Sequence, residues 1–173
     1  MRLNETPLLS AEEIGRRVAE LAAAVSADYT GRELLLVAVL KGSIVFMADL
    51  LRQLTVPATV EFIRARSYEK TRPQGPIEFT YFPERPIAGK HVLVIEDIVD
   101  TGGTAAAILE RFTADHPASL ALCALLDKPA RRETPVPIRY AGFTIDDHFV
   151  VGYGLDYDQR GRELPDIRIL EQE

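Results

Sequence analysis

Apolar residues along this chain follow two alternating patterns. Residues 34–40 and 120–127 form almost continuous apolar runs of strand length. A strand that is apolar on both faces is typical of the centre of a parallel sheet covered by helices, because neither face meets water. The sequence therefore predicts two central strands at these positions.

Stretches with helical periodicity separate these runs. Ser10 and Glu13 have the spacing of a capping box, and apolar residues recur after them at intervals of three and four, which predicts a helix. Ser43 is predicted to cap a second helix that runs to about Gln53, and a third helix is predicted over residues 104–114. The apolar positions of the first helix are Ile14, Val18, Leu21 and Val25.

Shorter runs complete the predicted elements. Strands that alternate with helices imply right-handed crossovers and a mainly parallel sheet, so the pattern indicates the α/β class. In such sheets ligands bind beyond the carboxyl ends of the strands. The remaining predicted elements are strands at 58–65, 77–82 and 91–98, a polar loop at 66–76, a turn at 83–89, and short strands at 138–143 and 149–152 in a smaller C-terminal unit.

Composition and charge narrow the class of protein. The 173 residues, 47% hydrophobic and 27% charged, suit one globular domain. No apolar run reaches the ~20 residues of a membrane span, and the N-terminus lacks a signal-peptide pattern, so we expect a cytoplasmic protein that does not bind membranes. The net charge of −6 argues against a nucleic-acid partner, but an acidic protein binds polyphosphates through a divalent cation. Cys123 is predicted to be a small buried hydrophobe, and three scattered histidines argue against a zinc site.

Candidate chemistry gathers at the end of the strand predicted over 91–98. Its last residues include Glu96 and Asp97, Asp100 follows, and the turn 101–104 (Thr-Gly-Gly-Thr) leads into the third helix. The glycines expose backbone amides, which together with a helix N-terminus and hydroxyl groups suit a phosphate monoester. The carboxylates suit sugar hydroxyls, a metal ion or a proton to be removed. The pattern therefore predicts a site for a phosphorylated sugar, whereas P-loop and dinucleotide-binding signatures are absent from the sequence.

Residues 92–104 resemble the 5-phosphoribosyl-1-pyrophosphate (PRPP) motif of type I phosphoribosyltransferases. The likeness runs from about residue 34 to the end of the chain. Other segments are similar to the hypoxanthine-guanine branch of that family, in its bacterial type. These segments are residues 40–43, Asp127-Lys128, residues 149–157 and Arg162.

The resemblance implies a site with two halves joined by Asp100 as the general base at purine N7. In the purine half, Lys128 would donate to the 6-oxo group, Phe149 would stack on the base, and Val150 would offer backbone groups. The metal would be held by Glu96, Asp97 and Asp156, and Asp156 would also lie beside the base. The residues implied in binding PRPP are Lys41, Gly42, Ser67, Tyr68, Glu96, Asp97, Thr101, Gly102, Gly103, Thr104 and Arg162.

The resemblance also implies the fold and the assembly. A central, mainly parallel sheet flanked by helices would form one domain, with a core over 34–128 and a small hood from residues 1–9 and 129–173. A homodimer or homotetramer is expected. The first pyrophosphate loop of the family can contain a cis peptide without proline. The family's lid begins Ser-Tyr, as Ser67 and Tyr68 do, but residues 69–76 are charged and contain proline, unlike the usual small-residue stretch.

The implied reaction is a Mg²⁺-dependent transfer of phosphoribose from PRPP to hypoxanthine or guanine, which gives IMP or GMP and diphosphate in purine salvage. Three alternatives remain at this point. They are a phosphoribosyltransferase for another base such as xanthine, a regulatory nucleotide sensor that binds RNA, and a non-enzymatic sugar-phosphate binder.

Overall fold

A six-stranded sheet forms the centre of the computed structural model, which describes residues 2–67, 77–81, 83 and 86–171. The strand order is β3-β2-β1-β4-β5-β6, and every neighbouring pair is parallel except β2 with β3. This arrangement confirms the predicted α/β fold. The strands are β1 (Leu34–Val39), β2 (Ala58–Ser67), β3 (Ile77–Tyr81), β4 (His91–Val99), β5 (Ser119–Asp127) and β6 (Tyr140–Thr144).

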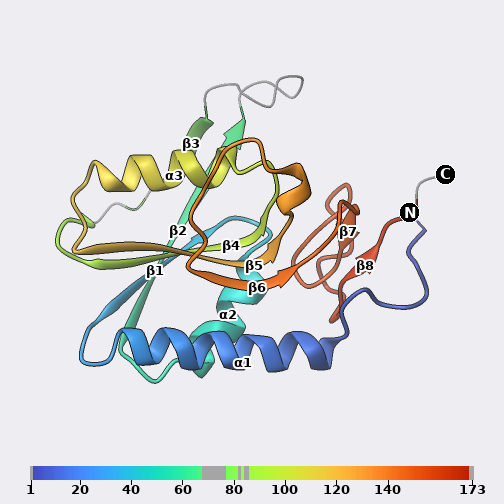
Figure 1. The fold of residues 1–173 in the computed structure, drawn as a ribbon, viewed down its shortest axis with the longest axis horizontal. Coiled ribbons are helices and arrows are strands. Elements are labelled where there is room, and N and C mark those ends of the chain that lie inside the picture. Colours follow the sequence, from blue (N-terminus) through green and yellow to red (C-terminus); the bar gives the residue numbers. More distant parts are fainter. Residues whose placement is uncertain (1, 68–76, 82, 84–85, 172–173) are drawn as a thin grey trace.

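Helices cover both faces of this sheet. Helices α1 (Ala11–Asp28) and α2 (Ile44–Gln53) lie on one side, and α3 (Gly103–Thr113) lies on the other (Figure 1). Residues of β1 alternate between the two cores: Leu36 packs in the cluster with α1 and α2, whereas Val37 packs in the cluster with α3. All six residues of β1 are buried, so the apolar run predicted a central strand correctly.

The two predicted helix caps have different outcomes. At α1 the Ser10 hydroxyl accepts from the Glu13 amide and the Glu13 carboxylate accepts from the Ser10 amide, so the capping box is confirmed. At α2, Ser43 precedes the first helical residue as predicted, but its side chain caps nothing. Its buried hydroxyl instead donates to the carbonyl of Val39 at 2.7 Å, which ties the helix start to the end of β1.

The C-terminal strands are distributed between the main sheet and the smaller unit differently from the prediction. A strand forms near residues 138–143, but the prediction that it belongs to the smaller unit is wrong. This strand, β6, extends the main sheet through parallel pairing with β5. The smaller unit contains β7 (Val150–Val151) paired with β8 (Arg168–Ile169). The N-terminal segment joins it through bridges of Leu3 with Leu170 and Leu9 with Ile167. Both ends of the chain therefore lie together beside the sheet (Figure 1).

Most other predictions for the elements hold with small shifts of boundary, although residue 82 of one predicted strand and residues 84–85 of the predicted turn lie outside the described residues. Cys123 is fully buried in β5 and burial raises the pKa of its thiol to about 12, so the prediction of a small buried hydrophobe is confirmed. Val151, expected in the core, is also fully buried. The loop predicted over 66–76 overlaps the end of β2 and otherwise lies outside the described residues. Among the described helices, none is long and apolar enough to span a membrane.

Candidate active site

A cavity of about 340 Å³ opens at the carboxyl ends of β1 and β4. The pairing of these strands stops at Ala38 with Ile95, although β4 continues to Val99, so the last residues of β4 are not covered by β1 on this side. This is the edge at which parallel sheets bind ligands. The residues of interest in its lining are Lys41, Gly42, Glu96, Asp97, Asp100, Thr101, Gly102, Thr104, Asp156 and Arg162.

The loop after β1 forms one wall of this cavity. The peptide bond between Leu40 and Lys41 is cis. A Cβ atom on Gly42 would lie 1.5 Å from a carboxylate oxygen of Asp97, so a larger residue here would have to displace the Asp97 side chain from its place in the cavity. The exposed Lys41 ammonium donates to the side-chain carbonyl of Gln159 at 2.9 Å.

Two neighbouring carboxyl groups form the floor. Glu96 is buried and Asp97 partly buried, and both line the cavity although they are adjacent in a strand. Burial raises the pKa of Glu96 well above its usual value, and the charge of Asp97 adds to this effect. Burial also raises the pKa of Asp97, opposed by the hydrogen bond from the Ile98 amide at 3.0 Å and by the charge of Arg162. The pair therefore favours a neutralising ligand, either a proton or a cation.

The turn between β4 and α3 supplies hydrogen-bond donors. Gly102 precedes the first residue of α3 with φ of +90°, a conformation that glycine adopts readily. In the part of the chain that the structure describes, the main-chain amides of Thr101 and Gly102 have no hydrogen-bond acceptor within the protein. Thr101, Gly102 and Thr104 line the cavity, and Gly103 begins α3 without lining it. Free amides at a helix N-terminus suit an anion.

A short loop in the smaller unit closes the cavity from the opposite side. Arg162 forms an ion pair with Asp156 at 2.6 Å and donates to the carbonyl of Gly154 at 2.6 Å. The other carboxylate oxygen of Asp156 accepts from the Gln159 amide at 2.9 Å. Because Gln159 also accepts from Lys41, the two cationic side chains of the cavity belong to one hydrogen-bonded network.

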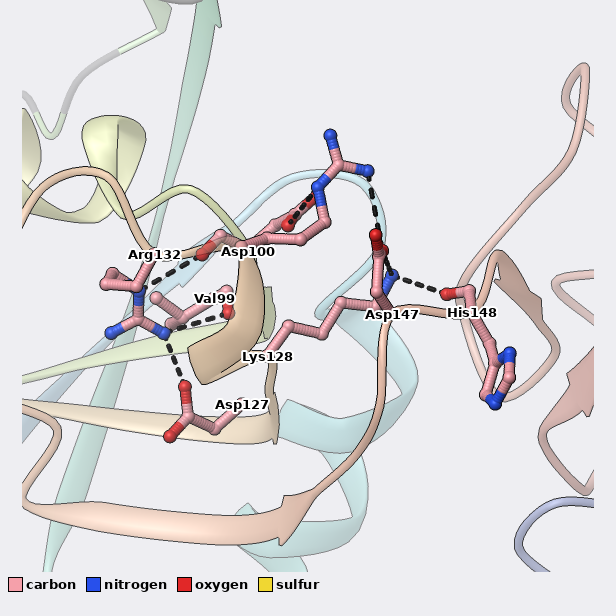
Figure 2. Close-up of polar contacts among 8 residues, drawn as sticks. Val99, Asp100, Asp127, Lys128, Arg132, Asp147 and His148 are labelled. Atoms are coloured by element: carbon pink, nitrogen blue, oxygen red, sulfur yellow. Dashed lines mark hydrogen bonds and ion pairs between the residues drawn. The ribbon is translucent and has the colours of Figure 1, made fainter.

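A second cavity of about 400 Å³ adjoins the first. Lys128 lines it and is only 5% exposed, which is rare for lysine, and its ammonium donates to the carbonyl of His148 (Figure 2). Phe149 is 47% exposed and meets Tyr157 edge-to-face at 5.8 Å between ring centroids. Phe149 therefore is not part of the core, and its ring is available to a flat ligand. Val150 contributes to the lining from β7.

Asp100 lines both cavities, as do Asp97, Ile98 and Asp156. Its Oδ1 atom is buried and receives no hydrogen bond, although Nε of Arg131 lies 3.2 Å away in an ion pair. The charge of Arg131 offsets part of the cost of burying this oxygen, and the Asp100 side chain as a whole is 38% exposed, so its carboxylate remains accessible to a ligand.

The structure brings together nearly all residues that the sequence predicted for the site. Of the exceptions, Ser67 is the last residue of β2, and Tyr68 lies outside the described residues. Two further residues that line the second cavity, Arg131 and Asp147, were not predicted from the sequence. They form an ion pair with 3.6 Å between Nη1 of Arg131 and Oδ1 of Asp147. The only signal in the sequence was their nearness to Lys128 and Phe149.

Comparison with known proteins identifies the family of this chain. The model of the phosphoribosyl transferase domain matches residues 6–158, and the chain belongs to this family. The chain is 46% identical over 159 residues to hypoxanthine phosphoribosyltransferase of Salmonella typhimurium, covering 88% of each chain. It is 43% identical over 171 residues to hypoxanthine-guanine phosphoribosyltransferase of Mycobacterium tuberculosis, covering 95% of this chain and 85% of that relative.

The fold agrees equally well with solved structures. A crystal structure of a hypoxanthine-guanine phosphoribosyltransferase from Bacillus anthracis has a TM-score of 0.94 and 39% identity, and the match covers 98% of this chain and all of that one. The resemblance found in the sequence motifs is therefore confirmed, and the fold is that of type I phosphoribosyltransferases.

Proposed function

We propose that this protein transfers the phosphoribosyl group of PRPP to hypoxanthine, and also to guanine, giving IMP or GMP and diphosphate in purine salvage. One observation carries the proposal: two cavities, one with groups that suit phosphates and one with a buried lysine and an exposed phenylalanine, share Asp100 in their walls. A base and a sugar phosphate bound in them would meet at this residue.

The first cavity supports binding of PRPP. The amides and hydroxyls of the turn 101–104 would hold the 5′-phosphate, because donors at a helix N-terminus favour an anion. Lys41, the Gly42 amide and Arg162 would hold the pyrophosphate from the opposite side. Ser67 and Tyr68 would belong to a lid that excludes water and so prevents hydrolysis of PRPP.

The second cavity supports a 6-oxopurine. Lysine is purely a donor, so Lys128 would favour a carbonyl at position 6 over the amino group of adenine. Phe149 would stack on the ring, while Val150 would contribute backbone groups at the purine edge. Asp156, in both cavities, would lie between the base and the pyrophosphate.

Glu96 and Asp97 have the donor chemistry for Mg²⁺, with Asp156 as a third candidate. Within residues 2–67, 77–81, 83 and 86–171, no three side chains of the usual ligand types converge to hold a metal unaided. This agrees with Mg²⁺ held by one or two carboxylates and by substrate oxygens. The raised pKa values of Glu96 and Asp97 also indicate a place where positive charge would be stabilised. Bound there, Mg²⁺ would neutralise charge that develops on the pyrophosphate.

Asp100 would act as the general base. Its side chain is 38% exposed and lines both cavities, so its carboxylate can accept the N7 proton as N9 attacks C1 of the ribose. The ribose would carry positive charge in the transition state, and the leaving pyrophosphate would be stabilised by Lys41 and Arg162.

An assay with PRPP, Mg²⁺ and each of hypoxanthine, guanine, xanthine and adenine tests the proposal. We expect nucleotide from the first two and little from adenine. If neither hypoxanthine nor guanine gave nucleotide, the proposal would be wrong. Turnover of xanthine alone would support the other-base alternative, and an RNA gel shift without turnover would support a regulator.

The proposal also covers the domain organisation, the cellular location and the oligomeric state. A single domain with a core over 34–128 and a hood from 1–9 and 129–173 is supported by the pairing of the N-terminal segment with residues around β8. Location in the cytoplasm remains a prediction from the sequence pattern, and assembly as a homodimer or homotetramer remains a prediction from the resemblance.

A further inference from the structure

The segment after β5 holds the turn 99–104 from behind. Nε of Arg132 donates to the carbonyl of Asp100 at 3.0 Å, and Nη2 donates to that of Val99 at 3.1 Å. The carbonyl of Thr101 accepts from the amides of Glu133 and Thr134, each at 2.9 Å. Residues 132–134 therefore bind three consecutive carbonyls, and the first of them, that of Val99, also accepts from the amide of Lys128 at 3.0 Å.

These bonds determine where the amides of the turn point. In a trans peptide the carbonyl of one residue and the amide of the next point in opposite directions. Carbonyls drawn toward Arg132 and its neighbours therefore direct the following amides away from this segment. Thr101 and Gly102, whose amides have no acceptor in the described part of the protein, lie in the cavity lining.

Arg132 is itself firmly held. Nη2 also pairs with the carboxylate of Asp127, the last residue of β5, and both side chains are largely buried (Figure 2). A Cβ atom on Gly102 would lie 2.8 Å from Cδ of Arg132 and 2.2 Å from the carbonyl oxygen of Thr134. The guanidinium thus connects the rigid end of a central strand with the backbone of the turn, which a planar fork of donors does well.

We propose that Arg132 is a positioning residue for the 5′-phosphate of PRPP: it holds the carbonyl of Asp100 so that the amide of Thr101 faces the ligand, while Glu133 and Thr134 hold the carbonyl that precedes the amide of Gly102. This inference rests on the proposed function, because it assumes that the turn binds a phosphate. Arg132 is absent from the lining of both cavities, so it acts through the turn rather than by touching the ligand.

The experiment compares two inhibitors that compete with PRPP. Ribose 5-phosphate would reach the turn 101–104, whereas Mg²⁺-pyrophosphate would use Lys41 and Arg162. For Arg132→Gln we expect the inhibition constant of ribose 5-phosphate to rise about ten- to a hundred-fold, the loss of one or two hydrogen bonds from a charged donor. The constant for Mg²⁺-pyrophosphate should change less than about three-fold, an order-of-magnitude bound for a contact left intact.

Two further variants keep the test decisive if Arg132→Gln folds poorly. Arg132→Lys retains the charge but cannot bridge two carbonyls and a carboxylate, so its loss should be intermediate. Asp127→Asn removes only the charge that anchors Arg132, and it should weaken ribose 5-phosphate selectively as well. Arg139→Gln is the matched control, because Arg139 pairs with Asp28 at 2.9 Å, outside both cavities.

The outcomes separate this inference from the proposed function. Equal weakening of both inhibitors, in step with a lower melting temperature, would show a purely structural role and overturn it. An unchanged constant for ribose 5-phosphate in Arg132→Gln would also overturn it. A wild-type protein that neither turns over PRPP nor responds to ribose 5-phosphate would instead remove the proposed function.

Discussion

At the scale of single residues, the site combines groups that are unfavourable in isolation. Glu96 and Asp97 are neighbouring carboxyls with raised pKa values, and Oδ1 of Asp100 is buried without a hydrogen-bond donor. Such groups reduce stability in the free protein. Their concentration around two adjoining cavities is the pattern expected of a ligand-binding site.

Asp100→Asn tests the general base. The amide keeps the shape of the side chain but accepts no proton, so we expect kcat to fall about 10²–10⁴-fold, the usual contribution of a general base. The inhibition constant of ribose 5-phosphate should stay near its wild-type value. Steady-state kinetics and inhibition measure both quantities. Turnover within a few-fold of wild type would remove Asp100 from this role.

Glu96→Gln tests the cost of the buried carboxyls. Because the pKa of Glu96 is raised on folding, its contribution to stability is fully present below the unfolded pKa of about 4.5 and is lost as pH rises through the folded value. Glutamine cannot ionise, so the variant should match wild type near pH 4.5 and become the more stable protein toward neutral pH. The gain is about 1.4 kcal/mol for each unit by which the pKa is raised.

The measurement is urea unfolding between pH 4.5 and 8 in the presence of a chelator. Glu110→Gln, which changes an exposed side chain on α3, is the control and should give a flat difference. A difference between Glu96→Gln and wild type that does not grow with pH would contradict the prediction.

At the scale of elements, short-range rules account for most of the structure. The capping box at α1 and the fully buried β1 follow directly from sequence spacing. Ser43 does not follow these short-range rules. Its hydroxyl donates to the carbonyl of Val39, and this hydrogen bond takes the place of a cap on the amides of α2. Packing contacts thus altered the role of a side chain without moving the helix start.

Ser10→Ala tests the cap of α1. It removes the hydroxyl that accepts from the Glu13 amide, and we expect the free energy of unfolding to fall by about 1 kcal/mol with unchanged kcat. Ser10→Thr keeps a hydroxyl that can both accept from the Glu13 amide and donate to the Glu13 carboxylate, so it should remain close to wild type. Equal stability of all three proteins in urea unfolding would contradict a role for this cap.

At the scale of the whole molecule, the two ends of the chain meet at the smaller unit. Arg168 of β8 pairs with the buried Asp166 and donates to the carbonyls of Asn4 and Glu5. Leu8 and Leu9 in turn donate to the carbonyl of Ile167. The loop 152–162, which carries Asp156 and Arg162, follows β7 of the same unit, so the contacts between the chain ends stabilise the unit that completes both cavities.

Arg168→Gln tests this connection by hydrogen exchange. Loss of the charged donor should speed exchange of the amides of Asn4, Leu8 and Leu9 about ten-fold, as expected for roughly 1.4 kcal/mol of local stability. Amides within α3 should be unaffected, and Arg139→Gln serves as a control because its ion pair with Asp28 lies at the opposite end of α1 from Leu9. Uniform acceleration throughout the protein would indicate global destabilisation instead.

The sequence alone was sufficient for most strands, the helices, the position of the turn 101–104 and the family, because these depend on periodicity and on contiguous motifs. It did not reveal that β6 joins the main sheet, that Lys128 is buried, or that Arg131 and Asp147 line the second cavity. Nor did it reveal the bonds of Arg132 to carbonyls about thirty residues earlier. Each of these features arises where distant segments pack together, and the local pattern of polar and apolar residues carries no record of which segments will meet.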